Sequence, residues 1–194
     1  MRLFHFSEDP GITVFEPRTA AVATDRAPGR EWLNDPLVWA IDERHEPMYL
    51  FPRDCPRVLV WPTGSSRADD IRQWWGERKC RMMAHIEWNW LERLRLTRLC
   101  RYELPVDSFE TIGDAGMWVS RLPVTPMRMD VIDDLPAALR DRHVELRVME
   151  RLAPLRPLWS TSLHVSGIRL RNTVDWSDWR PILAAQALKS SVVG

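Results

Sequence analysis

The chain has 194 residues and no formal net charge, because 27 basic residues balance 27 acidic ones. This balance argues against a strongly electrostatic nucleic-acid or membrane binder, without excluding a local charged patch. Hydrophobic residues make up 45% of the chain, which is typical of a globular protein with a substantial core. We expect a single domain over residues 1–174, followed by an amphipathic C-terminal helix or tail over 175–194.

Cysteine spacing and the lack of long apolar runs bear on the compartment. Cys55, Cys80 and Cys100 are widely spaced, which fits neither a disulfide framework nor a zinc site. The N-terminus lacks the apolar stretch of a signal peptide, and no run approaches the length that crosses a membrane. We therefore predict a cytoplasmic protein with no membrane association.

Hydrophobic runs bounded by turn residues predict the elements of the first half. The residues from 17 to 36, rich in Pro, Gly, Asn and Asp, predict a long loop that is either a lid or disordered. The expected strands are Arg2–Phe6, Leu37–Ile41, Arg57–Trp61, Cys80–Ile86 and Arg98–Leu104, and the expected helices are Glu43–Leu50 (capped by Asp42), one from Ser66 or Asp69 to Trp75, and Glu87–Arg95.

The second half predicts mainly short strands. They are Phe109–Ile112, Met117–Ser120, Val124–Ile132, Val144–Met149 and Ser162–Leu170, with helices at Leu135–Arg142 and Asp175–Leu188. Strands outnumber helices and do not alternate strictly with them. This pattern favours an α+β fold with mixed, mostly antiparallel sheets and short flanking helices over a doubly wound parallel sheet.

His5 and Ser7 are the first candidate ligand-binding residues. Residues two apart on a strand share a face, so both side chains point the same way. A neutral histidine there can donate to a ligand hydroxyl, and Ser7 can add a second contact. The alternative is a structural histidine that bonds to a backbone carbonyl.

A second group of candidates lies in residues 38–58. Tyr49 follows His45 by four residues on the predicted helix, and Arg53 and Arg57 flank Asp54 in a turn stiffened by two prolines. This turn can present one guanidinium to a phosphate while Asp54 holds the other. The alternative is a surface ion cluster, and the chain has no Gly-rich phosphate loop. An arginine near Cys55 would lower the pKa of its thiol, although a buried inert thiol is the more ordinary outcome.

Trp118 and Ser120 share a face of the predicted strand Met117–Ser120, and a ring beside a hydroxyl suits the wall of a planar ligand. Strand packing is the alternative. Arg169 and Arg171 share a face if their segment is extended, which makes either a further anion contact or a charged edge strand.

Several segments together resemble an uncharacterised bacterial family that is known only as a domain of unknown function. They are LFHFSEDPGITVFEPR, VWAIDERHEPMYLFPRDCPRV, YELP, MWVS and SGIRLRN. A more distant likeness is to the ADP-ribosyltransferase-like fold. That resemblance implies that His5 and Ser7 grip the ribose of NAD and that Trp39 or Tyr49 stacks on nicotinamide. The region that would carry the catalytic acid, Gly116–Ser120, has no acidic residue.

Three functions follow from these patterns. The first is a protein that binds NAD or another anionic, nucleotide-like ligand in an ADP-ribosyltransferase-like pocket. The second is a non-catalytic module that binds a small ligand or a protein. The third is a hydrolase that uses His5 with Asp42 or Glu43.

Overall fold

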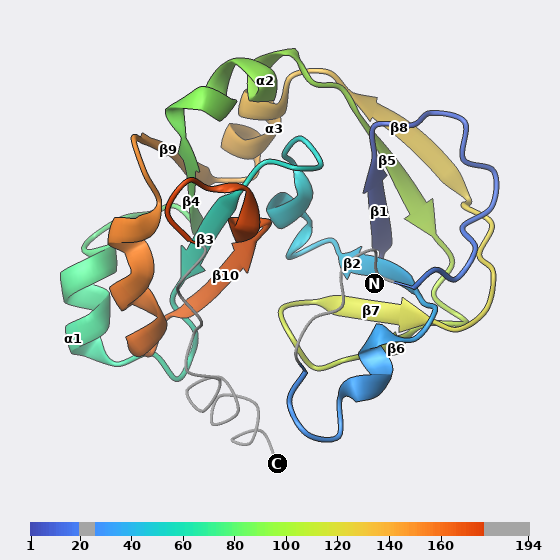
Figure 1. Ribbon diagram of the computed structural model, residues 1–194, viewed down its shortest axis with the longest axis horizontal. Coiled ribbons are helices and arrows are strands. Elements are labelled where there is room, and N and C mark those ends of the chain that lie inside the picture. The colour runs from blue at the N-terminus through green and yellow to red at the C-terminus, as the bar shows by residue number, and fades with distance from the viewer. Residues whose placement is uncertain (20–25, 177–194) are drawn as a thin grey trace. The chain divides into compact units, whose positions relative to one another are not determined.

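The structure, a computed structural model, describes residues 1–19 and 26–176, which form two compact units (Figure 1). Described residues of the first unit lie within 1–49 and 99–132, and those of the second within 50–98 and 133–176. Each unit has its own sheet with short flanking helices, and all strand pairs but one are antiparallel. This confirms the predicted α+β class. The single domain over 1–174 stays a prediction, and the predicted helix Asp175–Leu188 lies almost wholly outside the described residues.

The first unit is built on a six-stranded antiparallel sheet with the order β6-β7-β2-β1-β5-β8. Its strands are β1 (Leu3–Ser7), β2 (Val38–Asp42), β5 (Leu99–Leu104), β6 (Glu110–Thr111), β7 (Met117–Ser120) and β8 (Arg128–Ile132), and its 3-10 helices are η1 (Glu31–Asn34) and η2 (Glu46–Tyr49). In Figure 1, β8 lies beside β5 at the edge of this sheet. The ends of the predicted 17–36 loop are joined, because Arg18 and Leu37 exchange backbone hydrogen bonds.

Register fixes which residues share a face of this sheet. Leu3 lies opposite Leu104, and His5 lies opposite Tyr102. Alternation therefore places these residues on one face, which we call face A, together with Val38, Ala40, Trp118 and Ser120. Phe15 and Val124, which exchange backbone hydrogen bonds, pack on face A. The opposite face, face B, carries Phe4, Trp39, Arg101 and Val119.

The second unit has a four-stranded sheet with the order β10-β3-β4-β9. Its strands are β3 (Arg57–Trp61), β4 (Met82–Glu87), β9 (Val144–Met149) and β10 (His164–Ile168), and its helical segments are α1 (Ala68–Asp70), the π-helix η3 (Ile71–Trp75), η4 (Trp88–Trp90), α2 (Leu91–Leu96), α3 (Leu135–Asp141), η5 (Ala153–Ser160) and η6 (Leu170–Asn172). Every residue of β3 and β4 is buried. The continuous apolar run that predicts β3 is therefore explained by its central position in the sheet.

Proline explains why two of the predicted elements are shorter than expected. The predicted helix Glu43–Leu50 is a turn followed by the 3-10 helix η2, because Pro47 lacks the N–H that a longer helix needs. The predicted strand Val124–Ile132 is divided: Val124 pairs with Phe15, and β8 begins only at Arg128, two residues after Pro126.

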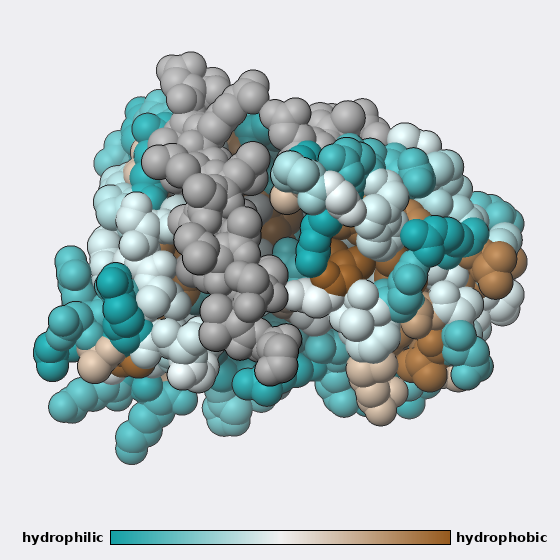
Figure 2. Space-filling view, turned by 90° about the horizontal axis from the view of Figure 1, so that it is seen from below, coloured by the Kyte–Doolittle hydropathy of each residue, from teal (hydrophilic) through white to brown (hydrophobic). Residues whose placement is uncertain are grey.

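Hydrophobic side chains also reach the surface, and Figure 2 shows some of them among hydrophilic residues on one face. Trp88, Leu96, Leu122 and Met127 are each more than half exposed. Scattered exposed hydrophobic residues are normal in globular proteins, so only those that form a row on one element suggest an interface.

His85 is a buried titratable group on β4, one of the two central strands of the second sheet. It is 3% exposed, and its Nδ1 lies 3.2 Å from the carbonyl oxygen of Val58. Burial lowers the pKa of His85 to about 4, although the contact with Val58 opposes the shift. In the folded protein the imidazole therefore stays neutral at pH values well below the ordinary histidine pKa.

We predict that His85 makes the protein less stable in mild acid. Between the ordinary histidine pKa of about 6.5 and about 4, the unfolded chain binds a proton that the folded chain does not. The free energy of unfolding should therefore fall by up to roughly 3 kcal/mol as the pH drops through this window. Urea denaturation of wild type and His85→Asn, whose amide can replace the Nδ1 contact, measures the effect.

His143→Asn is the matched control, because His143 is exposed and its left-handed backbone, with φ of 56°, also suits asparagine. Wild type and His143→Asn should lose stability in parallel, and His85→Asn should lose less. An equal loss in all three proteins would contradict the assignment.

Candidate functional site

The predicted ligand-binding residues of the first unit lie on two faces of one sheet. His5, Ser7, Trp118 and Ser120 belong to face A, whereas Trp39 belongs to face B. Tyr49, from η2, joins face B, because its ring stacks on Phe6 at 6.4 Å between centroids. A ligand lying on one face would meet only one of these groups, so the register does not bring the His5 side chain together with Trp39 or Tyr49.

His5 makes the backbone contact that the structural alternative predicts. Its Nδ1 lies 2.8 Å from the carbonyl oxygen of Trp39, and its ring centroid lies 4.6 Å from that of Phe15. Because a carbonyl oxygen can only accept, the ring donates from Nδ1. The Ser7 hydroxyl accepts from the backbone N–H of Asp9 at 3.1 Å. Both candidates thus help to hold the segment that follows β1 against face A.

Ser120 also has local partners. It is 1% exposed, and its Oγ lies 3.1 Å from the Oγ of Ser108 and from the backbone N and O of Leu122. Trp118 is half-buried and packs against the core cluster of face A. These contacts are those of strand packing and a strand-ending turn.

The turn at residues 52–57, in the second unit, buries one of its two arginines and leaves the other exposed. Arg57 is 3% exposed, donates to the carbonyl oxygen of Cys55 at 2.9 Å and lies over the Phe51 ring. Arg53 is exposed. Burial raises the pKa of Cys55 to about 12 and outweighs the lowering by Arg57, so the thiol is the buried, inert one that was the more ordinary expectation. The turn is also held from outside, because Asn172 donates to the carbonyl of Asp54 at 2.7 Å.

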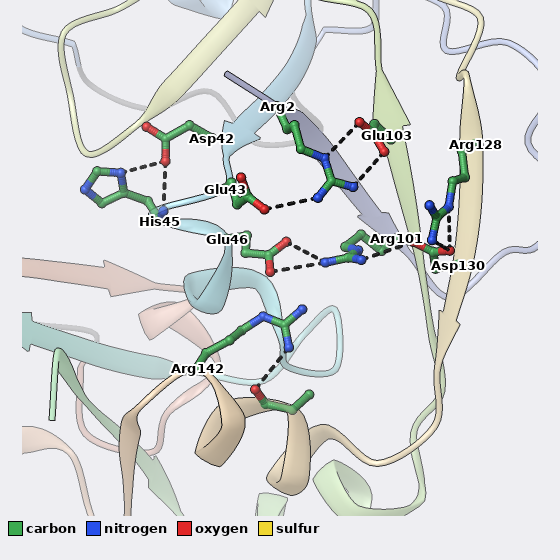
Figure 3. Close-up of polar contacts among 11 residues, drawn as sticks. Arg2, Asp42, Glu43, His45, Glu46, Arg101, Glu103, Arg128, Asp130 and Arg142 are labelled. Atoms are coloured by element: carbon green, nitrogen blue, oxygen red, sulfur yellow. Dashed lines mark hydrogen bonds and ion pairs between the residues drawn. The ribbon is translucent and has the colours of Figure 1, made fainter.

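A different pair of side chains, Asp42 and His45, stands at the end of β2. The Oδ1 atom of Asp42 lies 2.8 Å from His45 Nδ1 and accepts from the His45 backbone N–H at the same distance. The second contact is the capping bond that the sequence predicts for Asp42. Both side chains are less than one-fifth exposed. Figure 3 shows the second ring nitrogen of His45 directed away from the other residues drawn.

Gly116, which precedes β7, makes this pair possible. Its φ is +72°, and its carbonyl accepts from the backbone N–H of Asp42 at 2.9 Å. A Cβ atom at this position would lie 2.6 Å from Asp42 Cγ and still closer to His45 Nδ1. Only glycine therefore allows the β7 backbone to lie against both side chains.

A network of ion pairs continues from η2 across face B (Figure 3). Arg101 donates to Glu46 at 3.2 Å and to Asp130 at 3.1 Å, and Glu46 is 3% exposed. Arg2 makes a two-pronged contact with Glu103, at 2.9 and 2.8 Å. The guanidinium groups of Arg2 and Arg101 both lie within 5 Å of the Phe4 ring centre. Sequence reasoning missed this network because its members come from separate strands.

The pKa values of two carboxylates show that the network favours their charged forms. Hydrogen bonding from Arg2 lowers the pKa of Glu103. Burial by itself would raise the pKa of Asp130, but contacts with Arg128 and Arg101 outweigh it, so this pKa also lies below its ordinary value. The network is therefore a set of compensated charges rather than a proton donor.

Within 1–19 and 26–176, no three or more His, Cys, Asp or Glu side chains are placed to hold a metal ion. Over the same residues, no helix combines the length and the apolar character that crossing a membrane requires.

Comparison with known proteins identifies the family of the chain. Residues 4–173 match a family of unknown function, DUF6886. The chain belongs to this family. Neither a curated protein nor a solved structure matches it. Membership in DUF6886 agrees with the predicted likeness to a domain of unknown function, and nothing in the comparisons supports a bacterial source or the ADP-ribosyltransferase-like resemblance.

We predict that Gly116→Ala disrupts the Asp42–His45 pair. The left-handed backbone alone should destabilise the variant by about 1–3 kcal/mol, and the added methyl group must displace the pair. Urea denaturation gives the loss of stability, and the NMR resonance of the His45 Nδ1 proton reports on the pair. Gly64→Ala is the control, because a Cβ there meets no atom within 4 Å. Equal stability of both variants would contradict the role of Gly116.

We also predict that Arg101→Met destabilises the protein by about 3 kcal/mol, because it removes the cation beside the buried carboxylate of Glu46. Arg140→Met is the matched control, since the Arg140–Asp141 pair is 76% and 63% exposed. Its loss should stay below about 1 kcal/mol. Chemical denaturation of both variants measures the difference, and similar losses would show that burial of the Glu46–Arg101 pair is unimportant.

Proposed function

We propose that the protein binds a small ligand carrying a hydroxyl or ring N–H group at the Asp42–His45 pair. NAD and other nucleotide-like molecules belong to this class. The observation that carries the proposal is the 2.8 Å contact between Asp42 Oδ1 and His45 Nδ1, with glycine as the only residue that fits against it.

The pair has the arrangement by which proteins orient a histidine toward a ligand. A carboxylate that accepts from Nδ1–H favours the tautomer whose acceptor is Nε2. Nε2 lies across the ring from Asp42, and we propose that the ligand contacts this atom in competition with the protein's own groups. A donor group such as a ribose hydroxyl suits this acceptor.

Tyr49 and Met117 form a separate contact of a kind that suits a ring-bearing ligand. The Tyr49 hydroxyl donates to Met117 Sδ at 3.4 Å, and Met117 directly follows Gly116. Tyr49 is half-buried, so part of its surface faces solvent. An aromatic ring with an adjacent thioether forms an adaptable apolar wall. Register turns the Met117 side chain to face B, whereas Asp42 and Gly116 lie on face A. We therefore assign Tyr49 and Met117 no contact with a ligand at the Asp42–His45 pair.

The same pair supports binding more directly than catalysis. Nucleophilic catalysis requires a third group that the histidine activates, and the Asp42–His45 contact by itself does not supply one. The proposal is thus closest to the non-catalytic ligand-binding alternative, in the cytoplasm. It differs from the hydrolase alternative in that Asp42 partners His45, whereas His5 bonds to the Trp39 carbonyl.

Calorimetric titration with NAD, adenosine, nicotinamide and ribose tests the proposal. We expect at least one of them to bind, and His45→Asn to weaken its Kd by about tenfold or more, which corresponds to about 1.4 kcal/mol. Asparagine can keep a donor near the position of Nδ1, and therefore the contact with Asp42, but it has no counterpart of Nε2.

His5→Ala is the comparison that separates the two possible sites. If the ligand binds at His45, His5→Ala should leave the Kd unchanged once folding has been checked by circular dichroism. Loss of binding in His5→Ala with normal binding in His45→Asn would move the site to face A. No binding of any probe at about 1 mM would refute the proposal.

A further inference from the structure

The outer edge of the first sheet carries a regular pattern along β8 and at Met127, the residue just before it. Met127, Met129 and Val131 alternate with Arg128 and Asp130. The three apolar side chains are 62%, 39% and 55% exposed. The sheet order ends at β8, so its outer backbone groups have no neighbouring strand within the described sheet. An exposed edge with an apolar row is a template for pairing with another strand.

We propose that β8 pairs with β8 of a second copy of the chain, antiparallel and centred on Met129. A twofold axis at this residue places Met129 opposite its own copy and Met127 opposite Val131. It places Arg128 opposite Asp130 twice, once on each side of the axis. The two six-stranded sheets would then continue into one.

Charge selects this register over its neighbours. A shift that centres the axis on Arg128 would put two arginines opposite each other, and one centred on Asp130 would oppose two aspartates. Like charges directly opposite each other destabilise a strand pair, whereas opposite charges stabilise it. An axis between two residues would set the apolar row of one copy beside the charged row of the other. With the axis at Met129, apolar side chains of one copy therefore lie opposite apolar ones of the other, and each arginine lies opposite an aspartate.

The charged side chains are available for this exchange. Arg128 is 61% exposed, and its Nε contacts Asp130 of its own strand at 2.8 Å. Asp130 also accepts from Arg101 through its other oxygen, Oδ2, which holds the carboxylate in place. Arg128 can therefore turn from its own Asp130 to that of the second copy without exposing an uncompensated charge.

Sedimentation equilibrium of the full chain tests this dimer. Wild type should have twice the mass of one chain, and Met129→Lys, which sets two ammonium groups together at the axis, should sediment as a monomer. Leu122→Lys is the control: it adds the same charge at an apolar side chain that is 61% exposed and lies outside β8. It should remain a dimer.

A charge exchange tests the register itself. Arg128→Asp alone and Asp130→Arg alone should each give monomers, since each opposes like charges across the axis. An equimolar mixture of the two should recover the dimer, because each strand then meets its opposite. Thermal melts check that both variants fold; if Asp130→Arg does not, Arg128→Asp and Met129→Lys still decide.

Three results would overturn the proposal. They are a wild-type chain that stays monomeric up to about 1 mM, a Met129→Lys variant that remains a dimer, and a mixture of folded charge variants that stays monomeric. None of these outcomes depends on ligand binding at His45, so the two proposals stand or fall separately.

Discussion

The alternation of side chains along antiparallel strands decides which residues of the first unit can act together. Pairing of β1 with β2 and of β2 with β7 leaves no freedom in this respect, because a shift by one residue would turn the buried row of each strand to the other face. Leu3 and Ala40 on face A and Phe4 and Val119 on face B are each at most 3% exposed, so packing on both faces fixes the register. The register in turn separates His5 from Trp39 and places Arg128 and Asp130 together.

Charge is tolerated inside face B because each group has a partner of opposite sign. Glu46 is as buried as a core residue, and Arg101 meets it at 3.2 Å while also contacting Asp130 and lying over the Phe4 ring. Removing two charges from water is costly unless geometry and further contacts compensate. These ion pairs connect η2 with β5 and β8. They therefore help to position the segment that carries His45.

Local patterns predict the strands well. The bounds predicted for Arg57–Trp61, Met117–Ser120 and Val144–Met149 are those of β3, β7 and β9. These runs of apolar or alternating residues are short enough for one element and are bounded by turn residues, so neighbouring sequence contains the needed information. Two departures occur at Pro47 and Pro126, where a missing N–H ends a pattern that hydrophobicity alone would continue. The predicted strand Ser162–Leu170 is also shorter: it ends at Ile168, because Arg169 has a left-handed backbone and Leu170–Asn172 form a 3-10 helix, so Arg169 and Arg171 share no strand face.

The candidate site was less predictable, because it depends on a contact between distant parts of the chain. The capping bond from Asp42 follows from a local pattern, and it was expected. Gly116 approaches the pair only because β7 lies beside β2. The sequence around a glycine in a turn does not show which side chains its backbone will contact. The preference for glycine at position 116 has two independent causes, the positive φ and the close approach to Asp42 and His45. A turn alone would need only the first. The close approach makes Gly116 part of the site. Because position 116 has no side chain, the β7 backbone can lie against Asp42 and His45 without separating them.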